Sequence, residues 1–476
     1  MNVLFIKPNN LADHIQPSLG LAILANLIRD KHDVEFVDCI KENIPPENFA
    51  ENVIKGKRDN VDMICIQVYT FDLRNVKAIL KSIKEYDPKL LTVVGGAHIT
   101  TAPEEAMKDF GDMVDYAFAG EGELGFPKFV DAVANGNVEE VAGECPGLMY
   151  YKEDGTLSKT ETKLVPMEEL DNVGKIAWDI INPQTYPEAQ HGAFFEQFPI
   201  APIITTRGCP YKCTFCSAPQ MSGSALRHYS VDYILKEIKM LYDDYGIREI
   251  HIVDDNFTMD LPYAKAVLQG IIDMNLGISL AMPNGVRMDW LDDEILVLMK
   301  KAGMYMVTVA IENGNDRVLK LMRKGTTVAK IRRCVEKIKD HGFDVAAFFI
   351  LGYPSESYEE MENTIKFSLE LDLQRANYFT YLPLPGTQSY NELVSSGELE
   401  NIDWDNFYFM AGAYVPKHMS RERLLKTKKK AFSRFYLRPR IFFYNLMRVK
   451  NPRHFKFLFK RFCHWMLMNP EKEAAA

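Results

Sequence analysis

Two series of short apolar runs alternate with helical patterns along the chain, and this alternation constrains the fold more than any other feature. The first series occupies residues 1–150 and the second residues 201–390. Strands that alternate with helices are typical of parallel sheets, because parallel neighbours need long crossover connections. A chain of 476 residues is also too long for one ordinary domain. The sequence therefore predicts an α/β protein of at least two domains.

The first series predicts a doubly wound domain of the flavodoxin-like or Rossmann-like type over residues 1–150. An apolar helical pattern, Leu19–Arg29, follows its first strand-like run. Sheets of this kind bind ligands in the loops at the carboxyl ends of their strands. The expected strands are Val3–Pro8, Val34–Asp38, Met63–Tyr69, Leu91–Gly96 and Asp115–Glu123.

Two loops of this domain are rich in glycine and small polar residues: Gly95–Glu105 (GGAHITTAPEE) and Ala119–Glu123 (AGEGE). Glycine lets the backbone approach a bulky ligand closely. Ordinary turn glycines would give the same pattern. Each loop alone therefore leaves both interpretations open.

Residues 151–200 show little periodicity and contain four prolines, which predicts a linker that wraps the surface and has room for one hairpin. The second series has six βα units and predicts a partial (βα)6 barrel over residues 201–390, with function at the carboxyl ends of its strands. Residues 391–476 are expected to form a helical, basic region. The expected barrel strands are Ala201–Gly208, Glu249–Phe257, Ile278–Arg287, Met304–Gly314, Val345–Pro354 and Arg375–Thr387.

Three of the eight cysteines, Cys209, Cys213 and Cys216, lie within the run RGCPYKCTFC directly after the first barrel strand. Three thiolates on one loop can hold three irons of a [4Fe–4S] cluster, which usually has four cysteine ligands. One iron would then be open to a substrate or cofactor. The alternative is a zinc site completed by a histidine or a distant cysteine. The other cysteines lie singly, at Cys39, Cys65, Cys145, Cys334 and Cys463.

The N-terminal run MNVLFIKP leads straight into a strand pattern, and no apolar run reaches the roughly 18 residues of a transmembrane helix. We therefore expect a cytoplasmic protein, in which thiols stay reduced.

The net charge of −9 conceals a basic tail. Lys417–Trp465 holds 16 Lys and Arg against one acid, Glu422, which leaves 40 basic and 64 acidic residues elsewhere. The tail also contains many aromatic residues. It could pack on the acidic body, lie on an anionic membrane surface or, as the least favoured of the three, contact nucleic acid.

The run RGCPYKCTFC resembles the signature of radical S-adenosylmethionine (SAM) enzymes. The resemblance extends over about residues 201–387. It implies that Cys209, Cys213 and Cys216 bind a [4Fe–4S] cluster and that SAM chelates the fourth iron. It also implies that an electron, from a flavodoxin- or ferredoxin-type protein, cleaves SAM to a 5′-deoxyadenosyl radical.

Other strand ends resemble further motifs of that family. The runs VDDNF, IENGN and FILGYP match the second-, fourth- and fifth-strand motifs that contact SAM. Asp254 and Asp255 could instead cap the next helix, Arg287 could bind the SAM carboxylate or form an ordinary ion pair, and Phe215 could shield the cluster or belong to the core. The implied SAM and cluster contacts are Phe215, Asp254, Asp255, Arg287, Glu312, Gly352 and Pro354.

The first domain resembles the cobalamin (B12)-binding domain of one branch of the radical SAM superfamily, the class B methyltransferase-like enzymes. The runs PSLGLAILA (Pro17–Ala25), VVGGAH (Val93–His98) and AGEGE carry this resemblance. The implied cobalamin contacts are Leu19, Gly20, Tyr69, Thr70, Gly95, Gly96, His98, Gly120, Glu121, Gly122 and Glu123.

The chain departs from one cobalamin pattern: it lacks D-x-H-x-x-G, whose histidine binds cobalt. Asp13 and His14 are adjacent, and Gly20 is too distant to complete the motif. The resemblance then implies a lower cobalt face occupied by water, Tyr69, Thr70 or another loop residue. His14 and His98 are each either a hydrogen-bonding residue or a ligand.

These resemblances imply an enzyme that transfers a methyl group from methylcobalamin to an unactivated carbon of a small-molecule or lipid-like substrate. An oxidative cyclisation or rearrangement with the same cofactors is the first alternative, and a non-catalytic cobalamin or iron–sulfur sensor is the second. A methylthiotransferase would usually bring a second cysteine triplet. An aromatic pocket or an ordinary core would both explain the barrel residues Tyr305, Phe348, Tyr378 and Tyr381.

Overall fold

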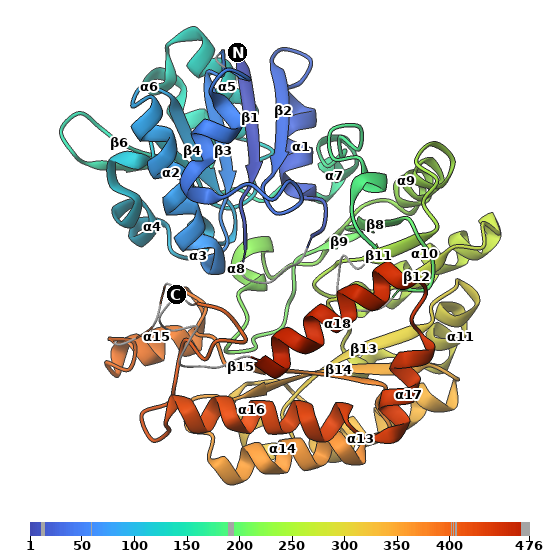
Figure 1. The fold of residues 1–476 in the computed structure, drawn as a ribbon. Coiled ribbons are helices and arrows are strands. Elements are labelled where there is room, and N and C mark those ends of the chain that lie inside the picture. Colours follow the sequence, from blue (N-terminus) through green and yellow to red (C-terminus); the bar gives the residue numbers. More distant parts are fainter. Residues whose placement is uncertain are drawn as a thin grey trace.

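The computed structural model describes residues 1–10, 15–58, 60–188, 195–400, 402, 404 and 407–467. Two α/β bodies lie one above the other, with the linker between them and the C-terminal helices against the second body (Figure 1). Asp13 and His14 fall outside the described residues. The fold class expected from the alternating pattern is confirmed.

The first body is a seven-stranded sheet in the order β2-β1-β3-β4-β5-β6-β7. Its first five strands are parallel and have the flavodoxin-like order, in which ligands bind at the switch point between β1 and β3. The strands are β1 (Asn2–Lys7), β2 (Asp33–Asp38), β3 (Met63–Gln67), β4 (Leu91–Gly95), β5 (Tyr116–Phe118), β6 (Leu148–Tyr151) and β7 (Leu157–Lys159).

The last two strands differ from the expected all-parallel sheet, because β6 and β7 form an antiparallel hairpin at its edge. A turn of five residues joins them, which is far too short for the crossover that parallel strands need. The hairpin carries the first sheet past the expected boundary at residue 150. The domain boundaries therefore stay predictions.

Helices cover both faces of this sheet, so apolar side chains are buried on each side. Glycine-containing loops at the carboxyl ends of the strands face the second body (Figure 1). The helices are α1 (Leu19–Ile28), α2 (Leu73–Tyr86), α3 (Ala97–Thr101), α4 (Pro103–Phe110), α5 (Phe126–Asn135) and α6 (Val138–Val141).

The second body is the expected partial barrel of six parallel strands. Two three-stranded ladders, β8-β11-β12 and β13-β14-β15, are joined by the isolated parallel bridges Leu280–Met304 and Val286–Val309. The strands are β8 (Ile200–Ile203), β11 (Glu249–Ile252), β12 (Ser279–Ala281), β13 (Met306–Glu312), β14 (Asp344–Leu351) and β15 (Arg375–Thr380), and a short antiparallel pair, β9 (Thr206–Arg207) and β10 (Arg227–His228), flanks the cysteine loop.

The two faces of the barrel sheet are filled differently. On β14, Val345, Ala347 and Phe349 are buried among the surrounding helices, whereas Phe348 and Ile350 on the lumen side are only half-buried. The lumen therefore has room for ligands. The helices of this body are α8 (Ala218–Ser222), α9 (Val231–Asp244), α10 (Leu261–Met274), α11 (Asp293–Lys301), α12 (Asp316–Leu321), α13 (Val328–Asp340), α14 (Tyr358–Glu370) and α15 (Gln388–Ser395).

The linker contains one short helix, α7 (Leu170–Val173), and Trp178 of the linker donates a hydrogen bond to Glu237 of α9. Three C-terminal helices follow: α16 (Arg421–Tyr436), α17 (Pro439–Met447) and α18 (Pro452–Leu467). The first packs on the outside of the barrel, and Arg448 after α17 forms ion pairs with Asp344 and Glu196. Within the described part of the chain, no helix is both long and apolar enough to span a membrane.

Candidate cofactor sites between the two bodies

The three loop cysteines, Cys209, Cys213 and Cys216, lie between β9 and α8 at the mouth of the barrel and are half-buried. Burial raises the pKa of Cys209, and it raises the pKa of Cys216 to about 12. Among the described residues, no three His, Cys, Asp or Glu side chains could share one metal ion.

Side-chain contacts brace this loop from behind. The Thr214 hydroxyl lies 2.7 Å from the Tyr353 hydroxyl, and the Thr214 carbonyl accepts from both the backbone N–H and the hydroxyl of Ser389. Tyr381 donates to the same Ser389 hydroxyl at 2.7 Å. Phe215 packs against the apolar cluster that contains both tyrosines. The cysteine loop is therefore held in place by protein contacts alone.

A lysine that the sequence motifs did not indicate joins two of the predicted site residues. Lys324 is buried, its ammonium donates to Glu312 at 2.8 Å, and its carbonyl accepts from Arg287 at 2.6 Å. Burial alone would lower the pKa of Lys324, but the charges of Glu312 and Cys213 raise it above its ordinary value. A positive charge therefore lies beside the cysteine loop.

Two of the predicted SAM contacts have unusual local surroundings. Glu312 follows a bulge in β13 and has a φ of 69°, a left-handed conformation that costs on the order of 1–3 kcal/mol outside glycine. The guanidinium of Arg287 lies 3.7 Å from the ring centre of Tyr211 in the cysteine loop and is 3.1 Å from Asp289. Strain of this kind is typical of functional sites, and here it sets the direction of the Glu312 carboxylate.

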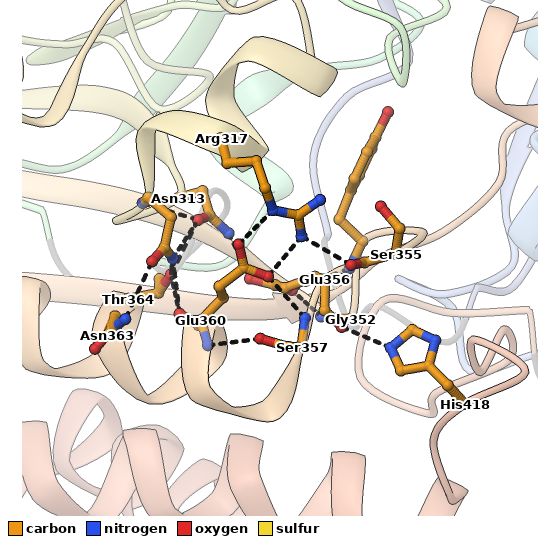
Figure 2. A network of polar contacts seen from close by, with 12 residues as sticks. Asn313, Arg317, Gly352, Ser355, Glu356, Ser357, Glu360, Asn363, Thr364 and His418 are labelled. Carbon is orange, nitrogen blue, oxygen red and sulfur yellow. Dashed lines mark hydrogen bonds and ion pairs between the residues drawn. The ribbon is translucent and has the colours of Figure 1, made fainter.

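A second residue outside the motifs, Glu356, connects the fourth- and fifth-strand loops (Figure 2). Its carboxylate accepts from the N–H groups of Gly352 at 2.6 Å and Tyr353 at 3.1 Å, and from the side chain of Asn313 at 2.6 Å. Burial raises the pKa of Glu356 to about 7. Gly352 lies buried in this network, whereas Pro354 next to it is half-buried.

The two aspartates after β11 have different surroundings. Asp254 is buried and accepts from the Thr205 N–H at 2.6 Å and from the hydroxyls of Thr205 and Thr206, so it ties the end of β11 to the end of β8. Asp255 is accessible to solvent, yet burial raises its pKa. A side chain that lines a hollow has both properties, because solvent reaches it while protein surrounds it on most sides. Asp254 thus acts within the framework, and Asp255 faces the mouth of the barrel.

The edge of the first sheet brings Tyr69, Thr70 and His98 together. His98 is buried, and its Nδ1 lies 3.2 Å from the Thr70 hydroxyl. Burial lowers the pKa of His98 to about 4, so the ring is neutral at pH 7. Tyr69 is 37% exposed, and burial together with the charges of Asp72 and Asp255 raises its pKa to about 12. Tyr69 therefore extends toward the barrel mouth, whereas His98 belongs to the packed start of α3.

The carboxylates of the AGEGE loop bind arginines of the barrel. Glu121 forms a two-pronged ion pair with Arg227 at 2.7 and 2.8 Å, and Glu123 pairs with Arg207 at 2.7 Å. Burial would raise the pKa of Glu121, but Arg227 and Arg207 hold it below its ordinary value. The structure thus shows Glu121 and Glu123 docking the two bodies. A cobalamin contact for either stays a prediction.

The remaining predicted cobalamin residues differ in how much space surrounds them. Leu19 is buried in a core shared with the linker, whereas Gly20 is exposed with open space around it. Gly96 has a φ of 111°, and a Cβ there would lie 3.0 Å from the Val68 carbonyl. Gly95, Gly120 and Gly122 are half-buried beside Phe118, Thr162 and Leu24.

This edge has the chemistry that a large, amide-rich ligand requires. Asn9 Oδ1, Gln16 Oε1 and Asp72 Oδ1 are buried oxygens without a hydrogen-bond partner in the structure. They follow β1 and β3, on either side of the switch point. Unsatisfied buried acceptors are costly, and the amide N–H groups at the rim of cobalamin would satisfy them. The residues present therefore fit cobalamin.

Sequence reasoning missed Lys324, Glu356, Arg207 and Arg227. Lys324, Glu356 and Arg227 are ordinary charged residues outside the recognised runs, whereas Arg207 begins the cysteine run without being a ligand position. Only the fold shows their partners. The one available signal was position: Glu356 comes two residues after FILGYP, and Arg207 is the first residue of the cysteine run RGCPYKCTFC.

Comparison with protein families identifies both bodies. Residues 203–368 match the radical SAM superfamily, and residues 11–130 match the B12 binding domain. Among solved structures, the cobalamin-dependent S-adenosylmethionine radical enzyme OxsB superposes with a TM-score of 0.72 over 98% of this chain and 71% of its own, at 17% identity. That likeness concerns the fold.

Three curated relatives align over most of the chain. An uncharacterized methyltransferase of Pyrococcus horikoshii is 30% identical over 94% of this chain and 92% of its own. The cytidylyl-2-hydroxyethylphosphonate methyltransferase of Streptomyces wedmorensis is 31% identical over 80% and 78%. The anaerobic magnesium-protoporphyrin IX monomethyl ester cyclase of Rubrivivax gelatinosus is 26% identical over 96% and 81%. With both domains present, the chain belongs to the cobalamin-binding radical SAM enzymes, whose cofactors are a [4Fe–4S] cluster, SAM and cobalamin.

Proposed function

We propose that this protein is a cobalamin-dependent radical SAM methyltransferase that modifies an unactivated carbon of a small molecule. The single observation that carries the proposal is the arrangement at the barrel mouth. The cysteine loop and the cobalamin-binding edge face the same space, because Arg207 and Arg227, on the two strands that flank the cysteine loop, bind Glu123 and Glu121 of the AGEGE loop. When bound, the cluster and SAM supply a carbon-centred radical and cobalamin carries the methyl group.

The chain's own residues would hold and orient these groups. Cys209, Cys213 and Cys216 would bind the cluster, and Glu312, fixed by Lys324, would accept hydrogen bonds from the SAM ammonium. The Glu121 and Glu123 ion pairs keep the two bodies in register, because their partners belong to the barrel. That register limits water access and places the substrate between both cofactor sites.

The test is anaerobic reconstitution of the full chain, followed by iron, sulfide and cobalamin analysis. The protein is then incubated with methyl-labelled SAM and an extract of its source cells. We expect 5′-deoxyadenosine together with a methyl-labelled product. Formation of 5′-deoxyadenosine with an unlabelled product would instead indicate cyclisation or rearrangement, which the similarity to the cyclase favours. Cofactor binding without any SAM cleavage would indicate a sensor.

We propose that an acidic electron carrier of the flavodoxin or ferredoxin type docks beside the cysteine loop. Lys212 and Arg323 are exposed there around Trp290 and Leu321, and the Leu321 carbonyl accepts from Thr214 of the loop. Charge reversal with Lys212→Glu should slow cluster reduction by flavodoxin, but not by dithionite. Equal slowing by both reductants would contradict this docking site.

We also propose that the C-terminal helices associate with an anionic membrane surface. Five of the six exposed phenylalanines among the described residues lie in α17 and α18, and Phe455 stacks on Phe459 with Lys456 and Lys460 beside them. Full-length protein should co-sediment with phosphatidylglycerol vesicles, and the paired change Phe455→Ser and Phe459→Ser should weaken this. Tyr151→Ser, at an exposed aromatic of β6, is the control. Equal binding by all three proteins would exclude this surface.

A further inference from the structure

Five aromatic side chains form a continuous line of ring contacts between the two bodies, here called the aromatic wall. Tyr69 and Phe71 stack with centroids 5.2 Å apart and an interplanar angle of 4°. The next contacts are 6.3 Å from Phe71 to Phe409, 5.6 Å from Phe409 to Phe379 and 5.8 Å from Phe379 to Phe348. The wall thus connects residues that are separated by up to 340 positions.

The wall runs from the barrel lumen to the cobalamin-binding edge. Phe348 and Phe379 are on the lumen side of β14 and β15, where Phe348 is in register with the half-buried Asn377 and Phe379 is in register with Ile350. The Thr380 N–H and hydroxyl donate to the Phe409 carbonyl at 2.9 and 2.8 Å, which fixes Phe409 at the end of β15. Tyr69 and Phe71 follow β3 of the first sheet.

The rings of the wall are only partly covered by protein. Tyr69 is 37% exposed and the other four are half-buried, although all lie between the two bodies. Uncovered aromatic surface inside a protein is typical of a ligand-binding cavity.

The faces of these rings carry no cation among the described residues. The cation–ring contacts of the structure lie elsewhere, for example Arg287 on Tyr211 and Arg423 on Tyr358. Rings prefer to stack with an offset or edge-to-face on other flat π-systems. A flat, uncharged and unsaturated group would match both properties of the wall.

We propose that the aromatic wall binds a planar, unsaturated ring system of the substrate, holding it flat between the two cofactor sites. This inference rests on the proposed function, because it identifies the class of substrate for that site. The two ends of the wall would place the substrate ring between the cofactor sites, because Phe348 reaches into the lumen and Tyr69 lies over the barrel mouth opposite Asp255. The wall also distinguishes Phe348 from the other three aromatic residues that were expected to line a barrel pocket.

Three of the four aromatic residues expected in a pocket have other partners. Tyr378 turns outward and packs on Phe432 and Phe435 of α16, Tyr381 is buried beside Ser389, and the Tyr305 hydroxyl donates to Glu249 at 2.9 Å. Phe348 alone belongs to the wall. The substrate surface is therefore built largely from residues outside that group.

The test uses two probes with the same carbon skeleton, flat naphthalene and puckered decalin. Binding of each to the reconstituted full-length protein is measured by saturation-transfer NMR titration. We expect naphthalene to bind roughly tenfold more tightly, and Phe379→Leu and Phe409→Leu each to weaken its binding by roughly two- to tenfold. Tyr151→Leu, far from the wall, should leave the affinity unchanged.

Equal affinity for both probes, no naphthalene binding, or unchanged binding in both wall variants would overturn the inference. The same preparations are assayed for 5′-deoxyadenosine. SAM cleavage without naphthalene selectivity would refute the wall and leave the proposed function standing. Naphthalene selectivity without SAM cleavage in the wild type would refute the proposed function and leave the aromatic wall as a binding surface.

Discussion

The cysteine loop and the cobalamin-binding edge lie across one space and differ in how far their hydrogen-bond acceptors are satisfied by the protein. Behind the cysteine loop, Thr214, Glu312 and Glu356 all have protein partners at hydrogen-bond distance. At the cobalamin-binding edge, Asn9 and Gln16 retain buried oxygens without a partner. The acceptors behind the cysteine loop are thus satisfied before any cofactor binds, whereas the sheet edge keeps open acceptors. At the barrel mouth, the Asn256 side chain and Arg287 Nε also lack a partner in the structure.

This difference matches the size of the groups involved. A cluster and SAM need a few donors and acceptors at fixed positions, which rigid side-chain networks provide. A corrin ring is large and presents many amides, so an edge of glycines and open acceptors accommodates it. Substitutions at the barrel end should therefore disturb chemistry and stability together, and those at the sheet edge should act mainly on cobalamin.

Cys213→Ala tests the barrel end most severely. With only two of the three loop thiolates left, the cluster should not assemble, and SAM cleavage should fall on the order of a thousandfold or more. Iron analysis and 5′-deoxyadenosine formation measure both effects. Cys334→Ala, at a half-buried cysteine of α13, is the matched control. Full iron content in the Cys213 variant would mean that another residue supplies the ligand.

Lys324→Met tests whether the ion pair between Lys324 and Glu312 organises the barrel end before SAM binds. The change leaves the Glu312 carboxylate buried without a cation, which costs about 3–5 kcal/mol of folding stability. The free energy of unfolding, measured with denaturant, and the affinity for SAM should both decrease. Adding Glu312→Gln to this variant should restore the stability but not the SAM affinity.

Lys236→Met is the control for this change, because Lys236 pairs with Asp232 on the surface of α9 and should contribute about 1 kcal/mol or less. Equal stability losses in the Lys324 and Lys236 variants would remove the distinction between the buried and the exposed pair.

Gly96→Ala tests the sheet edge. At a φ of 111° and with its Cβ 3.0 Å from the Val68 carbonyl, alanine should cost about 1–3 kcal/mol and weaken cobalamin binding. Thermal unfolding and cobalamin titration measure these effects separately. Gly143→Ala, which meets open space, should change neither. A cobalamin affinity equal to that of the wild type would show that the ligand does not approach Gly96.

Asp254→Asn should give the smallest effect, visible as a change with pH. Burial raises the pKa of Asp254 from 3.8 to about 6 in the folded protein. A raised acid pKa contributes stability below about pH 4 that is lost as the pH rises through 6. The wild type should therefore lose on the order of 1–3 kcal/mol relative to the variant between pH 4 and 7. A stability difference that does not vary with pH would contradict this.

The strands could be predicted from sequence because their apolar runs alternate regularly with helices. Each expected barrel run contains most of its observed strand, although the runs extend further, as Glu249–Phe257 does past β11, which ends at Ile252. The extra residues are the motif loops, whose composition resembles a strand but whose backbone leaves the ladder to form the barrel mouth.

The partners of the site residues could not be predicted, because they depend on contacts between distant segments. Glu121 and Glu123 have the composition of a ligand loop, yet Arg207 and Arg227 bind them from 84 to 106 positions away. Glu356 joins Asn313 across 43 positions. One hairpin was expected in residues 151–200, but the hairpin β6–β7 begins at Leu148 and joins the first sheet. Its strands are only four and three residues long, which is too short for the sequence pattern to indicate that pairing.

The contacts after α17 have a consequence for synthesis on the ribosome. Arg448 and Lys450 bind Glu196, and Asn451 binds Glu188, across 252 to 263 positions. During translation these linker carboxylates emerge long before their partners. The backbone of Glu196 and Gln197 can bind Glu249 earlier, but the Glu188 and Glu196 carboxylates lack these partners until residue 451 has left the exit tunnel. A nascent chain paused after the sixth barrel strand would remain more open to proteases at the linker than the released protein.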